Sequence, residues 1–148
     1  VVQSAESLLN NLLVWGTAQL KGDEVIHVPI ALHGLVDMVV TQNKPYFDKK
    51  GNEVIIRMRE DFVVKSDKNI LEFVLRNLLM NANKFSDQKM ITVHTTLTTS
   101  EVQIHVTDQG IGIETERIEK LFTWEKRRST PGTSGETGSG IGLKLCAE

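Results

Sequence analysis

The chain has 148 residues, of which 40% are hydrophobic and 24% charged, so it is long enough for one domain with its own core. Seventeen basic against nineteen acidic residues give a net charge of −2 without a long run of either sign, which indicates neither a nucleic-acid surface nor a membrane surface. The single cysteine, Cys146, excludes an internal disulfide, and no apolar run reaches the roughly 20 residues of a membrane span.

Hydrophobic periodicity predicts helices and strands in alternation along the chain. In chain order these are a helix over 1–20, a strand over 25–30, a helix over 31–47, strands over 53–60 and 62–66, a helix over 68–85, strands over 90–99 and 101–108, a helix, a glycine-rich loop and a final helix from 141. The strands over 53–60 and 62–66 form either a hairpin or two successive strands, and the later pair is antiparallel across Thr99 and Ser100. Helices on one face of a mostly antiparallel sheet, an α+β two-layer sandwich, is the economical packing.

The helix over 68–85, which Ser66 or Asp67 can cap, contains the stretch NLLMNANKFS. Its helical spacing predicts a core face and a solvent side that includes Asn83. The predicted core face consists of Leu71, Val74, Leu75, Leu78, Ala82 and Phe85. Asn77, Asn81 and Lys84 lie along the border between the core face and the solvent side, where a groove can open. The alternative is that this stripe is the ordinary polar edge of an amphipathic helix.

Two glycine-rich segments follow downstream. In the first, DQGIGI at 108–113, Asp108 ends a strand, so its carboxylate can accept from an exocyclic amine while the glycines let the backbone approach a ligand. Taken alone, this pattern is equally a turn.

The second segment, TPGTSGETGSGIGLKL at 130–145, leads glycine-lined amides into a helix start, which is typical of an anion site. It matches neither a Rossmann fingerprint nor a P-loop, and the alternative is a flexible surface linker. The basic residues 126–128 just before it are either a solvated face or neighbours of a phosphate site.

Together these elements indicate a site for a Mg²⁺-bound nucleotide. The amide oxygen of Asn81 suits one Mg²⁺ position, with phosphate oxygens and water at the others. Lys84, one turn further on, can neutralise phosphate, and Asp108 can bind a base.

The three segments resemble motifs of one family. NLLMNANKFS resembles the asparagine box of sensor histidine kinases, DQGIGI and GSGIGL resemble their two glycine boxes, and Leu121 with Phe122 resembles part of their phenylalanine box. The resemblance covers residues 23–148 and implies the catalytic ATP-binding domain of such a kinase, in the GHKL superfamily shared with gyrase, heat-shock chaperones and mismatch-repair ATPases. Residues 1–22 resemble the end of a dimerisation and phosphoacceptor helix with its linker.

Transferred by position, the resemblance implies a set of ATP-binding residues, namely Asn77, Asn81, Lys84, Phe85, Asp108, Gly110, Gly112, Gly138, Gly140 and Gly142. Among them Asn81 would be the Mg²⁺ ligand, Asp108 would bind the adenine amino group, and Phe85 would lie near the base. Asn77 and Lys84 would contact phosphates together with Gly138, Gly140 and Gly142. Residues 114–137 would be the ATP lid.

This sequence departs from the family pattern in three respects. None of the four histidines lies in a phosphoacceptor motif, so the accepting histidine is expected upstream of residue 1. The second phenylalanine of the phenylalanine box is absent, and Trp124 can substitute for it. Family domains also continue with further strands, so the C-terminal part of the fold is expected to be missing.

The resemblance also implies an activity. Hydrolytic members of the superfamily place a glutamate where this chain has Asn77, and an amide cannot act as a base, so phosphoryl transfer to a histidine with little hydrolysis is expected. The implied partners are ATP, a phosphoacceptor helical domain of the same protein or of a dimer mate, and a response-regulator receiver domain. The parent protein would be a homodimer, with this part in the cytoplasm and touching neither membrane nor nucleic acid. The alternatives are a catalytically inactive nucleotide-binding or scaffold module, and a protein-serine kinase of the same fold.

Overall fold

The computed structural model describes residues 12–13, 16, 27–123 and 130–147. Its elements are β1 (Val28–Ala31), α2 (Leu32–Lys49), β2 (Glu53–Arg57), β3 (Val63–Ser66), α3 (Lys68–Lys84), β4 (Met90–Leu97), β5 (Val102–Asp108), α4 (Thr115–Ile118) and α5 (Gly142–Ala147). The helix expected over residues 1–20 lies outside the described residues, except that residues 12, 13 and 16 are helical. Within the described ranges, no helix is both long enough and apolar enough to cross a membrane.

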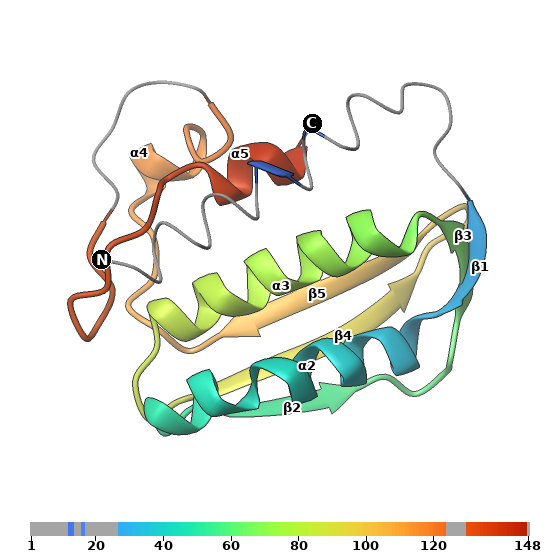
Figure 1. The fold of residues 1–148 in the computed structure, drawn as a ribbon, viewed down its shortest axis with the longest axis horizontal. Coiled ribbons are helices and arrows are strands. Elements are labelled where there is room, and N and C mark those ends of the chain that lie inside the picture. The colour runs from blue at the N-terminus through green and yellow to red at the C-terminus, as the bar shows by residue number, and fades with distance from the viewer. Residues whose placement is uncertain (1–11, 14–15, 17–26, 124–129, 148) are drawn as a thin grey trace.

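The strands form two sheets (Figure 1), one with the order β2-β4-β5 and one that pairs β1 with β3. β2 runs parallel to β4, whereas β4 is antiparallel to β5, as expected for the strands on either side of Thr99 and Ser100. A parallel pair needs a crossover connection, and here β3 and α3 provide it. The hairpin alternative for residues 53–66 is therefore wrong, because β2 and β3 belong to different sheets.

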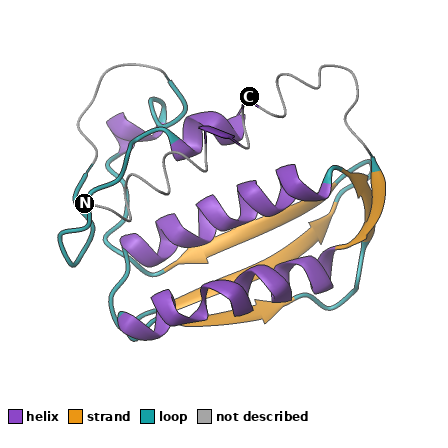
Figure 2. Cartoon of the chain, viewed as in Figure 1, coloured by secondary structure: helices purple, strands orange, loops and turns teal. Residues whose placement is uncertain are grey.

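Two helices cover one face of the three-stranded sheet, with α2 against β2 and α3 against β5 (Figure 2). The expected α+β two-layer arrangement is thus confirmed. The buried core between the layers consists of Ile30, Leu35, Val36, Val39, Phe47, Leu75, Leu79, Ala82, Ile91 and Val93. Each fully buried aliphatic side chain of this kind stabilises the fold by about 1.5–3 kcal/mol.

The period-2 alternation of the strands separates the two faces of the sheet. On β5, Ile104 and Val106 pack against the core, as expected from their spacing. His94 and His105 occupy the intervening positions, directly opposite each other in the register of β4 and β5. Their rings stack with centroids 4.5 Å apart on the sheet face away from the helices.

The N-terminus of α3 is capped by Asp67, whose Oδ1 accepts hydrogen bonds from the backbone N of Asn69 at 2.8 Å and of Ile70 at 3.2 Å. A carboxylate at this position satisfies two amides that have no partner within the helix, so one of the two expected caps is confirmed. The helix ends at Lys84, one residue before the expected end.

The buried positions of α3 differ in part from the sequence-based prediction. Leu75 and Ala82 are buried as expected, and Phe73 and Leu79 are buried as well. Asn83 was expected on the solvent side, but this prediction is wrong, since only 5% of its surface is exposed. Asn83 is buried because its amide hydrogen-bonds to residues of α2 and of the turn after it, as described below.

Candidate functional site

The last turn of α3 is the attachment point of both glycine-rich loops. The carbonyl oxygen of Phe85 accepts a hydrogen bond from the N of Ile111 at 3.1 Å, in the first loop. The carbonyl oxygen of Lys84 accepts one from the N of Thr133 at 3.0 Å, in the second. A helix end leaves its final carbonyls without partners inside the helix, and here these carbonyls hold the loops. Three motifs that are separate in the sequence therefore meet at one end of α3.

The first loop packs against α3 so closely that it requires glycine. Asp108 is exposed at the end of β5, and its Oδ1 accepts a hydrogen bond from the N of Gly110 at 2.8 Å. A Cβ added to Gly110 would lie 2.9 Å from the carbonyl carbon of Phe85 and 2.8 Å from Asp108 Oδ1, which is too close for any side chain. Gly112 has φ +74°, a left-handed conformation that favours glycine.

The second loop makes a similar close approach. A Cβ on Gly132 would lie 2.6 Å from the carbonyl oxygen of Lys84 and 2.7 Å from its Cγ. The N of Gly132 donates to the carbonyl oxygen of Glu136 at 2.8 Å, which closes a tight turn. Gly138 and Gly140 lie further along the loop, and Gly142 begins α5, which contacts α3. The helix start expected near Ile141 is thus present.

Asn77 and Asn81 are both half-buried on α3. Asn77 Nδ2 donates to the carbonyl oxygen of Phe73 at 2.9 Å, which fixes the amide and leaves its oxygen for another partner. The amide of Asn81 makes no hydrogen bond with the described residues, so its oxygen is available as a ligand. This donor fits Mg²⁺, which prefers oxygen ligands and usually retains water and phosphate oxygens as well. No group of three or more His, Cys, Asp or Glu that could hold a metal ion occurs among the described residues.

Lys84 lies directly beneath the second loop. Its Nζ donates to the carbonyl oxygen of Thr130 at 2.8 Å and lies 4.8 Å from the centroid of the Phe85 ring, within the range of a cation–π contact. The pKa of Lys84 is lowered, chiefly by burial; the carboxylate of Glu136 opposes this shift and the charge of Lys50 adds to it. Lys84, the expected phosphate contact, therefore lies near the charges of Glu136 and Lys50.

A polar cluster at this end of α3 was missed by the sequence reasoning. Asn52 Nδ2 donates to Asn83 Oδ1 at 2.8 Å, Asn83 Nδ2 donates to the carbonyl oxygen of Tyr46 at 3.2 Å, and Lys50 Nζ forms an ion pair with Glu136 at 2.7 Å. Lys50 and Asn52 lie in the turn after α2, outside the sequence motifs. The one available signal was Glu136, the only acidic residue in the glycine-rich segment 130–145.

The residues of the phenylalanine box are only partly described. Phe122 is 52% exposed and Leu121 is half-buried. Trp124 and the basic residues 126–128 lie outside the described residues, as does part of the expected lid.

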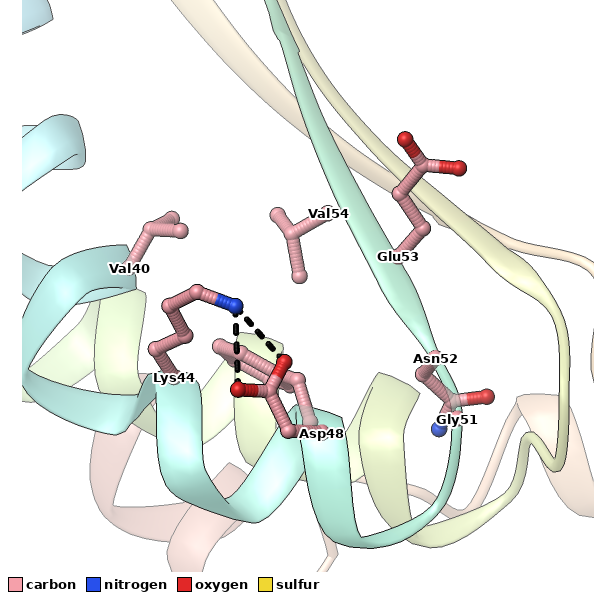
Figure 3. Close-up of a pocket in the computed structure, with 8 residues that line it drawn as sticks. Val40, Lys44, Asp48, Gly51, Asn52, Glu53 and Val54 are labelled. Carbon is pink, nitrogen blue, oxygen red and sulfur yellow. Dashed lines mark hydrogen bonds and ion pairs between the residues drawn. The ribbon is translucent and has the colours of Figure 1, made fainter.

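A pocket of about 500 Å³ lies elsewhere, between the C-terminal half of α2 and the start of β2 (Figure 3). Val40, Phe47 and Val54 supply its apolar lining. Lys44 and Asp48 at its rim pair with each other at 2.7 Å, and both side chains are well exposed. None of the expected ATP-binding residues lines this pocket, and the pairing of Lys44 leaves its rim poorly suited to a polyphosphate.

Comparison with known proteins identifies the family. Residues 66–148 match the family described as "Histidine kinase-, DNA gyrase B-, and HSP90-like ATPase". The chain therefore belongs to this family. It is a domain of the type found in sensor histidine kinases, and the resemblance of its motifs is confirmed.

The relatives agree with this assignment. The adaptive-response sensory kinase SasA of Prochlorococcus marinus is 32% identical over 151 residues, which cover 98% of this chain and 38% of SasA. In four other curated relatives the chain spans only 8% to 15% of the full length. The chain thus corresponds to a small part of these longer proteins.

Solved structures share the fold. Full-length ShkA in complex with AMPPNP has a TM-score of 0.76 at 22% identity, covering 95% of this chain and 29% of ShkA. Histidine kinase ThkA in complex with the response regulator protein TrrA has a TM-score of 0.63 at 21% identity, covering 80% of this chain and 37% of the matched chain.

Proposed function

We propose that this chain is the ATP-binding catalytic domain of a sensor histidine kinase, and that it transfers the γ-phosphoryl group of ATP to a histidine outside residues 1–148. The observation that carries the proposal is the attachment of both glycine-rich loops to the last turn of α3. This attachment brings the loop that follows Asp108 and the second glycine-rich loop to the end of the helix that carries Asn77, Asn81 and Lys84. Family membership and the AMPPNP-bound structural neighbour support the nucleotide as ligand.

In the proposed site Asp108 accepts from the adenine amino group, with Gly110 and Gly112 shaping the base pocket and Phe85 beside the base. Asn77 and Lys84 contact phosphates, and Gly138, Gly140 and Gly142 contribute backbone amides. Lys84 must then exchange its bond to the Thr130 carbonyl for a phosphate oxygen, which its flexible stem permits. Asn81 supplies an amide oxygen to Mg²⁺, and the metal, when bound with ATP, offsets phosphate charge.

Catalysis in this site is a matter of positioning reactants and stabilising charge. Asn77 stands one helical turn before Asn81, and its amide donates to the helix backbone and cannot take a proton from water. We therefore expect transfer to an imidazole and negligible hydrolysis. Asn77→Glu tests this point, because a carboxylate there should raise ATP turnover in the absence of an acceptor. Turnover by the wild type alone would contradict the reasoning.

The accepting histidine is proposed to lie on a helical domain of the same protein or of a dimer mate, to which residues 1–22 would lead. The phosphoryl group would then pass to a response regulator, a class of partner that is seen with the neighbour ThkA. We also propose a homodimeric parent protein and a cytoplasmic location for this domain, where ATP is available.

Isothermal titration with ATP and Mg²⁺ is the test of the ligand. Wild type should bind, and Asp108→Asn should weaken binding by at least about tenfold, because an amide presents a donor to the adenine amine. Asp37→Asn, which changes an exposed carboxylate on α2, is the matched control and should bind like wild type. A folded chain that does not bind ATP would favour the scaffold alternative.

The metal role has a separate test. In a longer protein that includes the phosphoacceptor histidine, Asn81→Ala should abolish autophosphorylation and the Mg²⁺ dependence of ATP binding. Autophosphorylation that survives this change would remove Asn81 from the metal site.

A further inference from the structure

Lys50 is a buried cation that no motif explains. It follows the last residue of α2, and only 8% of its surface is exposed. Its Nζ donates to Glu136 Oε1 at 2.7 Å and to the carbonyl oxygen of Lys84 at 2.8 Å. A buried ammonium group is costly unless it is paired, so these two contacts are the reason that it can stay charged there.

Its partner, Glu136, is an acid in a loop that is proposed to hold phosphates. Lys50 engages one oxygen of this carboxylate, and the N of Ser134 donates to the other at 2.9 Å. Burial acts to raise the pKa of Glu136, but the hydrogen bonds from Lys50 and from backbone amides together outweigh it, so the pKa is lowered. The group is therefore an anion at neutral pH, with both of its oxygens occupied.

Lys84 lies within electrostatic reach of the same carboxylate. The stem of Lys84 and a carboxylate oxygen of Glu136 both crowd the position that a Cβ on Gly132 would take. Glu136 also acts on the pKa of Lys84, in the direction that favours the charged form. If Lys50 were absent, the negative charge of Glu136 would be uncompensated. Glu136 would then attract Lys84 and repel a triphosphate.

We propose that Lys50 is a positioning residue of the nucleotide site, which holds and neutralises Glu136 and so keeps this carboxylate from competing with phosphate for Lys84. This inference rests on the proposed ATP-binding function. It assigns a role to a residue outside the sequence motifs, and it makes the turn after α2 part of the site.

A purely structural role for Lys50 predicts a different pattern of mutant effects. If Lys50 only tied the loop to α3, then losing either partner would loosen the loop and weaken ATP binding. If Lys50 instead restrains an unfavourable charge, its loss matters only while Glu136 is an anion. Lys50→Met does not leave the Lys84 carbonyl without a donor, because the N of Thr133 also donates to it.

The experiment measures ATP·Mg²⁺ affinity by titration calorimetry for the wild type, Lys50→Met, Glu136→Gln and the double variant. Lys50→Met should weaken binding by about tenfold or more, as expected for a phosphate-binding lysine captured by an unscreened carboxylate. Glu136→Gln should bind more tightly than wild type, and the double variant should recover most of the lost affinity. Lys44→Met removes a lysine from the exposed pair with Asp48 and should leave affinity unchanged.

The outcomes separate the two proposals. A wild type that is folded by circular dichroism but does not bind ATP refutes the proposed function and this inference with it. A wild type that binds, with Lys50→Met equally tight or with a double variant as weak as Lys50→Met, refutes the role of Lys50 alone. If Lys50→Met does not fold, Glu136→Gln decides, because weaker binding by this single variant overturns the proposal and tighter binding supports it.

Discussion

Replacing Asn83 by alanine should destabilise the fold although this residue carries none of the proposed chemistry. Its amide makes two tertiary hydrogen bonds, one from Asn52 Nδ2 at 2.8 Å and one to the carbonyl oxygen of Tyr46 at 3.2 Å. At about 1 kcal/mol net for each, Asn83→Ala loses about 2 kcal/mol. Alanine regains about 0.5 kcal/mol of helix propensity, and the small void left behind adds a comparable cost. The expected loss is about 2 kcal/mol, or about 4–8 °C in Tm.

Urea denaturation followed by circular dichroism measures this loss, and Asn43→Ala is the matched control. Asn43 is also a buried helical asparagine, but among the described residues its amide donates only to the carbonyl oxygen of Val39 in the same helix, at 2.8 Å. Its replacement should cost about 1 kcal/mol, since one bond is lost and the regained helix propensity again offsets the cost of a small void. Equal free energies of unfolding for the two variants would refute the claim that Asn83 joins α3 to α2 and to the turn that follows it.

Three further predictions concern the loops and the thiol. Gly110→Ala should cost about 1–3 kcal/mol of stability and weaken ATP binding, because the new methyl would overlap Phe85; urea titration and calorimetry check this, and an unchanged variant would contradict the packing. The pKa of Glu136 is lowered in the folded state, so its contribution to stability is present above its ordinary pKa of 4.5 and is lost as the pH falls through the folded value. The difference in unfolding free energy between wild type and Glu136→Gln should therefore shrink below pH 4.5. Burial raises the pKa of the Cys146 thiol to about 11, so its alkylation by iodoacetamide at pH 8 should be slower than that of free cysteine, and an equal rate would contradict this burial.

Much of the fold could be predicted because it is encoded locally. The alternation along β4 and β5 and the carboxylate of Asp67 before α3 each express a preference within a few positions of the chain. The pairing of β2 was ambiguous, because a strand followed closely by another strand can form a hairpin or enter a different sheet. The parallel partner that decides the matter lies more than thirty residues away.

In the candidate site, too, features encoded locally could be predicted and features that depend on tertiary contacts could not. The asparagine stripe and both glycine-rich segments pointed to a site only when they were considered together, because each pattern alone also fits an amphipathic helix edge, a turn or a linker. The roles of Lys50 and Asn83 could not be predicted, since each depends on a tertiary partner. Lys50 reaches Glu136 across 86 positions of the chain, and Asn83 reaches Asn52 across 31. A buried polar residue looks like a solvent-facing one until its hydrogen-bond partner is known.

The loops are joined to the end of α3 through main-chain oxygens, and this has an evolutionary consequence. The carbonyls of Lys84, Phe85 and Ser86 receive donors from Thr133, Ile111 and Asn52 respectively, whichever side chains positions 84 to 86 bear. In the proposed nucleotide site, substitutions at 84 and 85 would therefore change the side chains near the ligand without detaching the loops. An exchange of a single peptide linkage for an ester, which weakens a carbonyl as acceptor, would perturb the anchorage while keeping every side chain. Ligand preference and loop anchorage can thus diverge independently at these positions.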